Sequence, residues 1–375
     1  MRRLGLLAVV FLQALASSAV TGQTQNAHSS LFITETIASD VMDENRPLSI
    51  YLPKNYASSD ASYPVLYLLD GETHIFHVAG LVDFLVSVGR IPELIIVGIH
   101  SVDRYRDYTP NKIEHHPGTG GAAKFTSFLV DELFSHVEST YRTRPFRMIF
   151  GHSYGGTYVT HIFLNNPTLF GGYIAASPNL LVLDDVVDEF DTKFVNRHNG
   201  RRKMFLAVGE HEPAFVAITS DLASRVSDSP SVQSLWNYRV LSQDNHTSTP
   251  HRTIYFGLES IFQEFWHFGA ETDGASLVEQ FRVLSDRLGY DVVVPLSALV
   301  SLGNSALASE RLDQAQSIFE LLVKSYPESE WGYVSLGSVH YSKGNMDRAR
   351  SYFRKAMGIN PDNPYTQDML RTLGK

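Results

Sequence analysis

A serine flanked by glycines is the first place in this sequence where chemistry can be expected. Ser153 lies in the stretch GHSYGG, residues 151–156, which fits the pattern Gly-x-Ser-x-Gly. A serine hydroxyl is a poor nucleophile until a base within hydrogen-bonding reach takes its proton. With such a base the pattern would support acyl transfer, in which the hydroxyl attacks a carbonyl carbon. An ordinary glycine turn with a capping serine is the alternative.

The residues on either side of Ser153 favour the catalytic interpretation. Residues 148–150 form an apolar run typical of a buried strand, and residues 154–163 carry the spacing of an amphipathic helix. A strand, a sharp turn with serine at its tip and then a helix form the nucleophile elbow of α/β-hydrolases. In that turn the hydroxyl lies at a helix N-terminus, whose dipole favours a developing oxyanion.

A histidine downstream of the serine is needed as the base, since α/β-hydrolases carry their triad in the order serine, acid, histidine. His246 is the best candidate, because it follows an apolar stretch at 237–242 and lies in a polar loop before an amphipathic segment. His251 is the rival, although it falls where the next helix is expected to begin. In either position the imidazole would take the proton of the attacking hydroxyl.

The acid that orients this base is expected on the loop after an apolar stretch at 203–210. Glu212 lies three residues beyond the turn glycine, where hydrolases often place the acid, and Glu210 is the fallback. Asp221 falls within an expected helix, and Asp244 lies too close in sequence to the base. The alternative is that both glutamates are ordinary solvated loop carboxylates.

An oxyanion hole requires two backbone N–H groups. One is expected from Tyr154, the residue after the nucleophile, and the other from the loop after an early strand. The stretch YLLDGE at residues 67–72 supplies that loop, with Gly71 and Glu72 as candidate donors. An ordinary turn at a strand end is the alternative.

Short apolar runs alternate with longer amphipathic runs from about residue 45 to 270. The expected strands cover residues 48–53, 64–71, 93–100, 147–153, 171–177, 203–210 and 237–242. Several are apolar throughout, which is typical of strands buried on both faces. A helix is expected over 122–141, with one face formed by Phe125, Phe128, Leu129, Leu133 and Val137. Together with the elbow, this alternation predicts an α/β-hydrolase with a doubly wound, mostly parallel sheet.

The C-terminal part follows a different pattern, a repeat with an offset of 34 residues. The matched pairs are Leu302 and Leu336, Gly303 and Gly337, Ala315 and Ala349, Phe319 and Phe353, and Pro327 and Pro361. Period and residue types fit the tetratricopeptide repeat, a helix-turn-helix unit. Two such units are fewer than an independent stack needs, so we expect them to pack on the main domain or on a capping helix within residues 365–375.

The chain therefore divides into five predicted segments. Residues 1–22 carry Arg2 and Arg3, then a short apolar run and small residues, which indicates a signal peptide. The others are a hydrolase domain at 23–270, a connecting helix and turn at 271–296, two repeats at 297–364 and a capping segment at 365–375. Export would place the protein in a periplasm or outside the cell, with no membrane span in the mature chain.

Composition excludes several classes of function. The net charge of −9, which becomes −11 once the two arginines of the signal peptide are removed, argues against a nucleic-acid partner. The absence of cysteine excludes disulfides, thiolate metal sites and a cysteine nucleophile. His74 with His77 and His115 with His116 lack a third ligand, so we predict no metal site and no cofactor.

Several stretches together resemble a known family. YLLDGE, RYRDYTP (104–110), GHSYGG, AASPNL (175–180), VGEHE (208–212) and NHTSTPHRTIYFGL (245–258) occur in the order and spacing of the esterase D and enterochelin-esterase-like family. The chain is also similar to mycobacterial mycolyltransferases and S-formylglutathione hydrolases. The resemblance covers roughly residues 30–270. It implies a carboxylic-ester hydrolase with Ser153 as nucleophile, His246 as base and Glu212 as acid, and with Tyr154 and Glu72 as oxyanion donors.

The expected substrate is a small or siderophore-like ester. Its pockets are expected to be shaped by loops at 72–90 and 103–121. Two other functions stay open: an acyltransferase of the same fold, and an interaction scaffold in which the repeats bind a protein or peptide. The sequence alone does not separate them.

Overall fold

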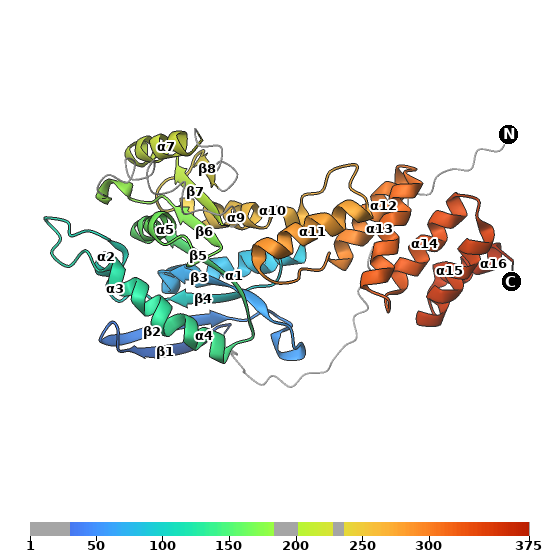
Figure 1. Ribbon diagram of the computed structural model, residues 1–375, viewed down its shortest axis with the longest axis horizontal. Coiled ribbons are helices and arrows are strands. Elements are labelled where there is room, and N and C mark those ends of the chain that lie inside the picture. Colours follow the sequence, from blue (N-terminus) through green and yellow to red (C-terminus); the bar gives the residue numbers. More distant parts are fainter. Residues whose placement is uncertain (1–30, 184–201, 228–235, 375) are drawn as a thin grey trace, which may run out of the picture. The chain divides into compact units, whose positions relative to one another are not determined.

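The chain folds around a mixed β-sheet, shown in the computed structural model of Figure 1. The structure describes residues 31–183, 202–227 and 236–374, so the predicted signal peptide at 1–22 lies outside the described residues. The eight described strands follow the order β1-β2-β4-β3-β5-β6-β7-β8. Their bounds are β1 Ile33–Ser39, β2 Glu44–Tyr51, β3 Tyr63–Leu69, β4 Ile95–Ile99, β5 Thr143–His152, β6 Gly172–Ala176, β7 Lys203–Gly209 and β8 Trp236–Leu241.

Strand direction places the functional loops on one edge of the sheet. β1 and β2 pair antiparallel, and β2 is antiparallel to β4, whereas all neighbours from β4 to β8 are parallel. This confirms the predicted doubly wound, mostly parallel sheet. Since the carboxyl ends of parallel strands lie at the same edge, the loops after β3, β5, β7 and β8 open on that edge together.

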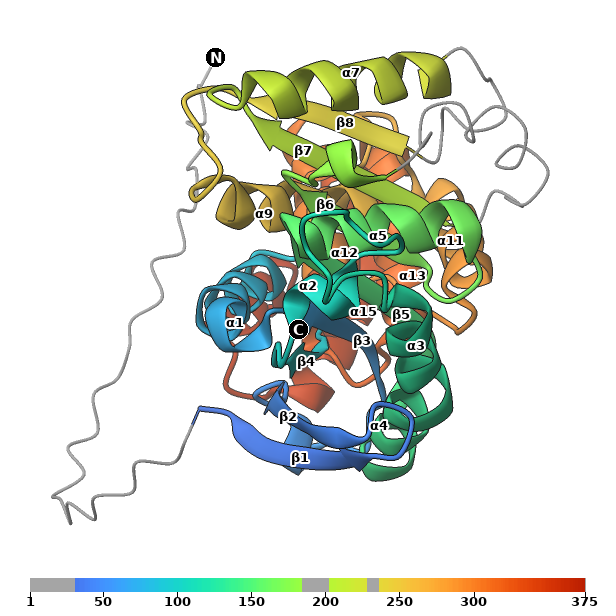
Figure 2. The same ribbon diagram turned by 90° about the vertical axis from the view of Figure 1, so that its left-hand side faces the viewer.

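Helices cover both faces of the sheet (Figure 2). One face carries α1 (Gly71–Ser87) and α9 (Thr249–Ile261). The other carries α3 (Ala122–Ser127), a π-helical turn η2 (Phe128–Leu133), α4 (Phe134–Thr140), α5 (Tyr154–Asn165) and α7 (Pro213–Ser227). Along β3, Val65, Tyr67 and Leu69 pack into one core and Leu66 and Leu68 into the other, because successive side chains of a strand point to opposite faces.

The seven expected strands are all present, and the structure differs from the sequence-based expectation at two places. β1 was not expected, because as an edge strand it alternates exposed and half-buried residues and lacks an apolar run. The expectation of a pocket-forming loop at 72–90 is wrong, since α1 occupies most of this range. The helix expected over 122–141 is present as α3, η2 and α4, with the predicted apolar face buried.

Short helical turns also lie among the strand connections. They are η1 (Tyr56–Ser58), α2 (Arg104–Tyr108) and η3 (Leu180–Val182). Two of them follow strands that lead to the functional edge, since α2 follows β4 and η3 follows β6. In the described part of the chain, no helix combines the length and the apolar character that crossing a membrane requires.

The described secondary structure of the C-terminal region consists of helices joined by short connections. It comprises α10 (Gln263–Trp266), α11 (Gly274–Leu288), α12 (Leu296–Ala308), α13 (Leu312–Ser325), α14 (Glu330–Ser342), α15 (Met346–Ile359) and α16 (Pro364–Thr372). The repeated glycine lets the two helices of a unit approach closely. A Cβ atom on Gly303 would lie 2.3 Å from the Phe319 ring, and one on Gly337 would lie 2.7 Å from the Phe353 ring.

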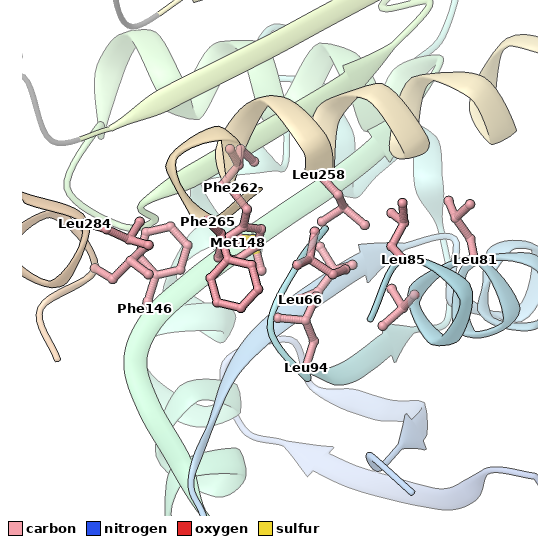
Figure 3. Packing of buried hydrophobic residues seen from close by; sticks show 14 of the residues in the cluster. Leu66, Leu81, Leu85, Leu94, Phe146, Met148, Leu258, Phe262, Phe265 and Leu284 are labelled. Carbon is pink, nitrogen blue, oxygen red and sulfur yellow. The ribbon is translucent and has the colours of Figure 1, made fainter. Parts of the chain in front are cut away.

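The first repeat shares its apolar core with the sheet. The described residues from Phe32 onward belong to one compact unit. A single buried cluster runs from Leu66 and Met148 in the sheet through Phe281 of α11 to Leu299 of α12 and Phe319 of α13. Figure 3 shows part of this packing around Phe146, Phe265 and Leu284. The second repeat has a small core of its own, formed by Val334, Ala349, Phe353 and Ala356 and packed against residues of α16.

Candidate active site

Ser153 lies at the tip of a strained turn between β5 and α5. Its φ and ψ are 58° and −120°, a region that residues other than glycine rarely occupy and that costs on the order of 1–3 kcal/mol. Its N–H donates to the Ala176 carbonyl at 3.0 Å, which holds the turn against β6. A Cβ atom on Gly151 would lie 2.3 Å from the carbonyl carbon of Gly155. The glycines are therefore required by the close approach of strand and helix.

Glu212 and His246 form a hydrogen-bonded pair. The Nδ1 atom of His246 donates to Oε1 of Glu212 at 2.6 Å. The Glu212 side chain is 7% exposed, whereas the His246 side chain is 38% exposed. The other carboxylate oxygen, Oε2, accepts from the Ser177 hydroxyl at 2.6 Å and from the Gly209 N–H at 2.8 Å. These bonds fix the carboxylate and leave Nε2 of His246 as the ring atom that can accept a proton.

The loop that carries His246 also contacts the elbow. Nε2 of His152 lies 2.8 Å from the His246 carbonyl oxygen, and the centroids of the two rings lie 4.6 Å apart. Among the described residues there is no hydrogen bond between the Ser153 hydroxyl and His246. Catalytic hydrogen bonds are often longer in unliganded enzymes and shorten when substrate binds. The structure thus places the predicted base against His152, the residue that precedes the predicted nucleophile.

The candidate oxyanion donors lie at the first turns of α1 and α5. Glu72 and Tyr154 are helix-start residues, so their N–H groups have no acceptor within the helix. Strands β3 and β5, which lead to these two helices, are parallel neighbours. The Asp70 carboxylate faces the elbow, because a Cβ atom on Gly155 would lie 3.5 Å from it. The Glu72 side chain is turned away and accepts from the hydroxyl and N–H of Ser101.

Gly71, the alternative donor, has a packing role. It is buried at the start of α1, and a Cβ atom on it would lie 2.3 Å from the carbonyl carbon of Gly98 in β4. Glycine at this position lets the helix start directly against the strand. Its own N–H also belongs to the first turn of α1, so the structure leaves both Gly71 and Glu72 as donors.

The other candidates from the sequence lie elsewhere. Glu210 accepts a hydrogen bond from the Gln243 N–H at 2.9 Å rather than from His246. Asp244 is buried in an ion pair with Arg252 at 2.6 Å. Asp221 lies on α7 and is mostly exposed, with Arg225 at 3.8 Å. His251 lies on α9, with its Nδ1 3.3 Å from Nδ1 of His77.

Two residues at this edge were given no role from the sequence. Ser177, which has a positive φ of 41°, donates to Glu212, and Arg104 pairs with Asp70. Both belong to stretches that resemble the family, AASPNL and RYRDYTP. Ser177 directly follows β6, and Arg104 lies in the connection that follows β4, so their places after strands could have singled them out.

Three histidines lie beside the site, His74 buried and His77 and His152 half-buried, and all three are uncharged near neutral pH. Burial, reinforced by nearby positive groups, lowers the pKa of His74 to about 3 and those of His77 and His152 to about 4. Nδ1 of His74 and Nε2 of His77 share a hydrogen bond of 2.9 Å. Among the described residues, no group of three or more His, Asp or Glu side chains has the arrangement needed to hold a metal ion.

Aromatic side chains surround the open side of the site. A pocket of about 330 Å³ is lined by Glu212, Pro213, Ala214, Phe215 and His246. The Phe215 ring centroid lies 5.5 Å from that of His246. On the elbow side, the Tyr154 ring lies 5.1 Å from that of Tyr105, which stacks on His116 at 5.9 Å. The space beside the candidate base His246 is therefore suited to an apolar or aromatic group.

Comparison with known families supports the expected type of both parts of the chain, the hydrolase domain and the repeats. A family model described as "Putative esterase" matches residues 39–261. Two tetratricopeptide models match residues 297–329 and 332–363.

Individual relatives support the same assignment. The chain is 31% identical over 224 residues to the ferri-bacillibactin esterase BesA of Bacillus subtilis, covering 51% of this chain and 76% of that one. It resembles the crystal structure of an IroE-like serine hydrolase from Shewanella oneidensis, with 27% identity, a TM-score of 0.63, and coverage of 78% and 98% of the two chains. An uncharacterised protein from Capnocytophaga ochracea shares the fold at 17% identity and a TM-score of 0.70, over 91% of this chain and 99% of its own.

The family model spans more than half of the chain, and its match includes the elbow, the Glu212 loop and the His246 loop. The region that follows carries tetratricopeptide repeats. The chain belongs to this esterase family of α/β-hydrolases, and it is an ester hydrolase with tetratricopeptide repeats at its C-terminus.

Proposed function

We propose that this protein is a serine carboxylic-ester hydrolase that works through an acyl-enzyme. Ser153 is the nucleophile, His246 the base and Glu212 the acid that orients it. The observation that carries this proposal is the 2.6 Å bond between His246 and Glu212, beside a serine at a φ of 58°. A buried carboxylate fixed by two further donors has little use on a solvated loop, whereas it stabilises an imidazolium formed during catalysis.

The reaction proceeds in two halves. Nε2 of His246 takes the proton of Ser153 as Oγ attacks the ester carbonyl carbon, and the N–H groups of Tyr154 and of Glu72 or Gly71 stabilise the resulting oxyanion. The intermediate collapses, and His246 returns the proton to the departing alcohol. Water, activated by the same histidine, then attacks the acyl-enzyme and releases the acid and the free serine.

The substrate we propose is a small or siderophore-like ester. The pocket beside His246 carries Phe215, and Tyr105 and Tyr154 lie on the elbow side, so aromatic groups can stack near the scissile bond. The relative BesA is named as an esterase of ferri-bacillibactin. The test is to measure kcat/KM for p-nitrophenyl esters of increasing acyl-chain length and for an aryl-bearing ester of similar size. The comparison would show whether the enzyme prefers aliphatic or aromatic substrates.

We further propose that the protein is exported, acting in a periplasm or outside the cell, and that its repeats contact a protein or peptide. The N-terminal sequence supports export through its arginine pair and short apolar run. N-terminal sequencing of the protein recovered from cell fractions would test this, since a mature chain starting near residue 20 or 23 is expected. Recovery of the chain with Met1 intact from the cytoplasm would contradict export.

Covalent labelling tests the catalytic assignment most directly. A fluorophosphonate probe should label the wild-type protein on Ser153, and Ser153→Ala should lose both labelling and p-nitrophenyl ester turnover while keeping its circular dichroism spectrum. Ser139→Ala is the matched control, because this exposed serine on α4 bonds only a carbonyl of its own helix. Unchanged turnover by pure Ser153→Ala protein would overturn the proposal.

A further inference from the structure

We propose that Arg104 is a positioning residue that neutralises Asp70 and ties together the two backbone turns of the oxyanion hole. This inference rests on the proposed function of Ser153 and adds to it a residue outside the triad. Arg104 lies on α2, in the stretch RYRDYTP, to which the sequence assigned no chemistry.

Asp70 occupies a costly position. It is buried, with 6% of its surface exposed, and its left-handed φ of 51° and ψ of 48° turn the chain from β3 into α1. Its side chain does not cap the helix that it precedes. The next two residues, Gly71 and Glu72, carry the candidate oxyanion donors. A carboxylate is therefore fixed immediately before the N–H groups that must receive a second negative charge.

Arg104 provides the opposite charge. Its Nε donates to one oxygen of Asp70 at 3.2 Å and its Nη2 to the other at 3.1 Å, a bidentate pair. Burial raises the pKa of Asp70, and the guanidinium counteracts this and favours the charged carboxylate. A charge pair has a weaker field than an isolated carboxylate, so the oxyanion formed nearby is repelled less.

The same guanidinium reaches the elbow. Nη2 of Arg104 also donates to the His152 carbonyl at 3.4 Å, and this carbonyl directly precedes Ser153. The Arg104 guanidinium lies 5.9 Å from the centroid of the Tyr154 ring. One side chain thus bonds the turn that holds the first donor and the turn that holds the second. Movement of either turn relative to the other would separate the two N–H groups.

Two single variants, Arg104→Met and Asp70→Asn, distinguish neutralisation of the Asp70 charge from mechanical support of the turns. Arg104→Met leaves Asp70 as an unpaired carboxylate beside the oxyanion, so kcat should fall about 10- to 100-fold with KM within about threefold. Asp70→Asn removes the negative charge, while its amide oxygen can still accept one hydrogen bond from Arg104. The link between the two turns therefore remains, and at least half of kcat should persist. If the contact served only as support that needs both hydrogen bonds, Asp70→Asn would lose about as much activity as Arg104→Met.

The double variant provides the decisive comparison. Asp70→Asn combined with Arg104→Met removes both charges, and kcat should recover at least about fivefold relative to Arg104→Met alone. Lys203→Met is the matched control, because this half-buried lysine pairs with Glu264 at 2.8 Å at the start of β7, the opposite edge of the sheet. It should lower thermal stability and leave kcat unchanged.

Other results would overturn the inference. A double variant no more active than Arg104→Met excludes neutralisation, and a loss confined to KM would make Arg104 a substrate contact instead. Should Arg104→Met not fold, the asymmetry between Arg104→Gln and Asp70→Asn gives the same test. Fluorophosphonate labelling of Ser153 distinguishes failure of this inference from failure of the proposed function. If Ser153 is labelled but kcat does not change in the Arg104 variants, only the role of Arg104 is contradicted.

Discussion

The Nε2 atom of His152 lies 2.8 Å from the carbonyl oxygen of His246. Because a carbonyl only accepts, this nitrogen must carry the proton, which fixes the tautomer of the uncharged ring. The elbow residue next to the nucleophile therefore holds the backbone of the proposed base. This contact joins the end of β5 to the loop after β8, and these two strands are not neighbours in the sheet.

The paired histidines His74 and His77 predict how stability depends on pH. In the folded chain the pKa of His74 is about 3 and that of His77 about 4, whereas both groups titrate near 6.5 when unfolded. Between pH 6.5 and 4 the unfolded chain therefore binds more protons, so the free energy of unfolding falls as the pH falls. Urea unfolding at pH 7.5 and 5.0 should show this loss, and His77→Gln should lose less. An equal loss in both proteins would contradict the prediction.

Glu212→Gln tests the orienting acid. The amide keeps the shape of the side chain but cannot stabilise a charged imidazolium, so kcat should fall on the order of 10²–10⁴-fold. Glu210→Gln is the matched control, because this carboxylate contacts the Gln243 N–H and not His246. Steady-state kinetics with a p-nitrophenyl ester measure both. A loss in Glu210→Gln as large as that in Glu212→Gln would mean that the acid is wrongly assigned.

Gly151→Ala tests the close approach in the elbow. The new Cβ atom would lie 2.3 Å from the Gly155 carbonyl carbon, so strand and helix must separate, at a cost of about 3 kcal/mol. Gly80→Ala is the control, because this exposed glycine within α1 has nothing within 4 Å of an added Cβ. It should stabilise the protein by about 0.5–1 kcal/mol. Urea unfolding measures both, and two variants of equal stability would refute the packing argument.

Truncation tests the shared core. A chain ending at residue 296 lacks Leu299 and Phe319, which pack in the same cluster as Phe281 of α11. Its thermal midpoint should fall by more than about 10 °C, or the protein should aggregate. A chain ending at residue 363 lacks α16, which packs against the small core around Phe353, but keeps the core shared with the sheet. Its thermal midpoint should therefore fall much less. Equal midpoints for the 296-residue chain and the full chain would show that the repeats fold separately.

The strands were predictable from the sequence because the sheet is covered on both faces. Every residue of β3 is buried, so an uninterrupted apolar run marks this strand without any knowledge of its neighbours. β1 lacks this signal, since one of its faces is exposed. Helix α1 was misread as a loop because Phe76 and Phe84 are 67% and 53% exposed, which blurs the boundary between its apolar and polar faces.

The candidate site was predictable to the extent that local motifs carry it. Ser153 follows from its glycines, and Glu212 and His246 follow from their places after strands. For Arg104 and Ser177 a place after a strand marks the position but not the role, because the role depends on the partners Asp70 and Glu212, which lie 34 and 35 positions away in the sequence. Only the folded sheet brings these pairs together. The bonds that surround a triad depend on tertiary structure even where the triad itself can be read from a motif.

The core that the sheet shares with the first repeat has a consequence for protein synthesis. The strands and the proposed triad are complete once residue 246 has left the ribosome. When Phe265 follows, it still lacks Phe281, whose ring centroid lies 5.9 Å from its own in the finished protein, and α13 is made later still. A nascent chain at this stage exposes apolar surface that favours aggregation. The last third of the polypeptide must therefore follow quickly, or a chaperone must cover that surface until it does.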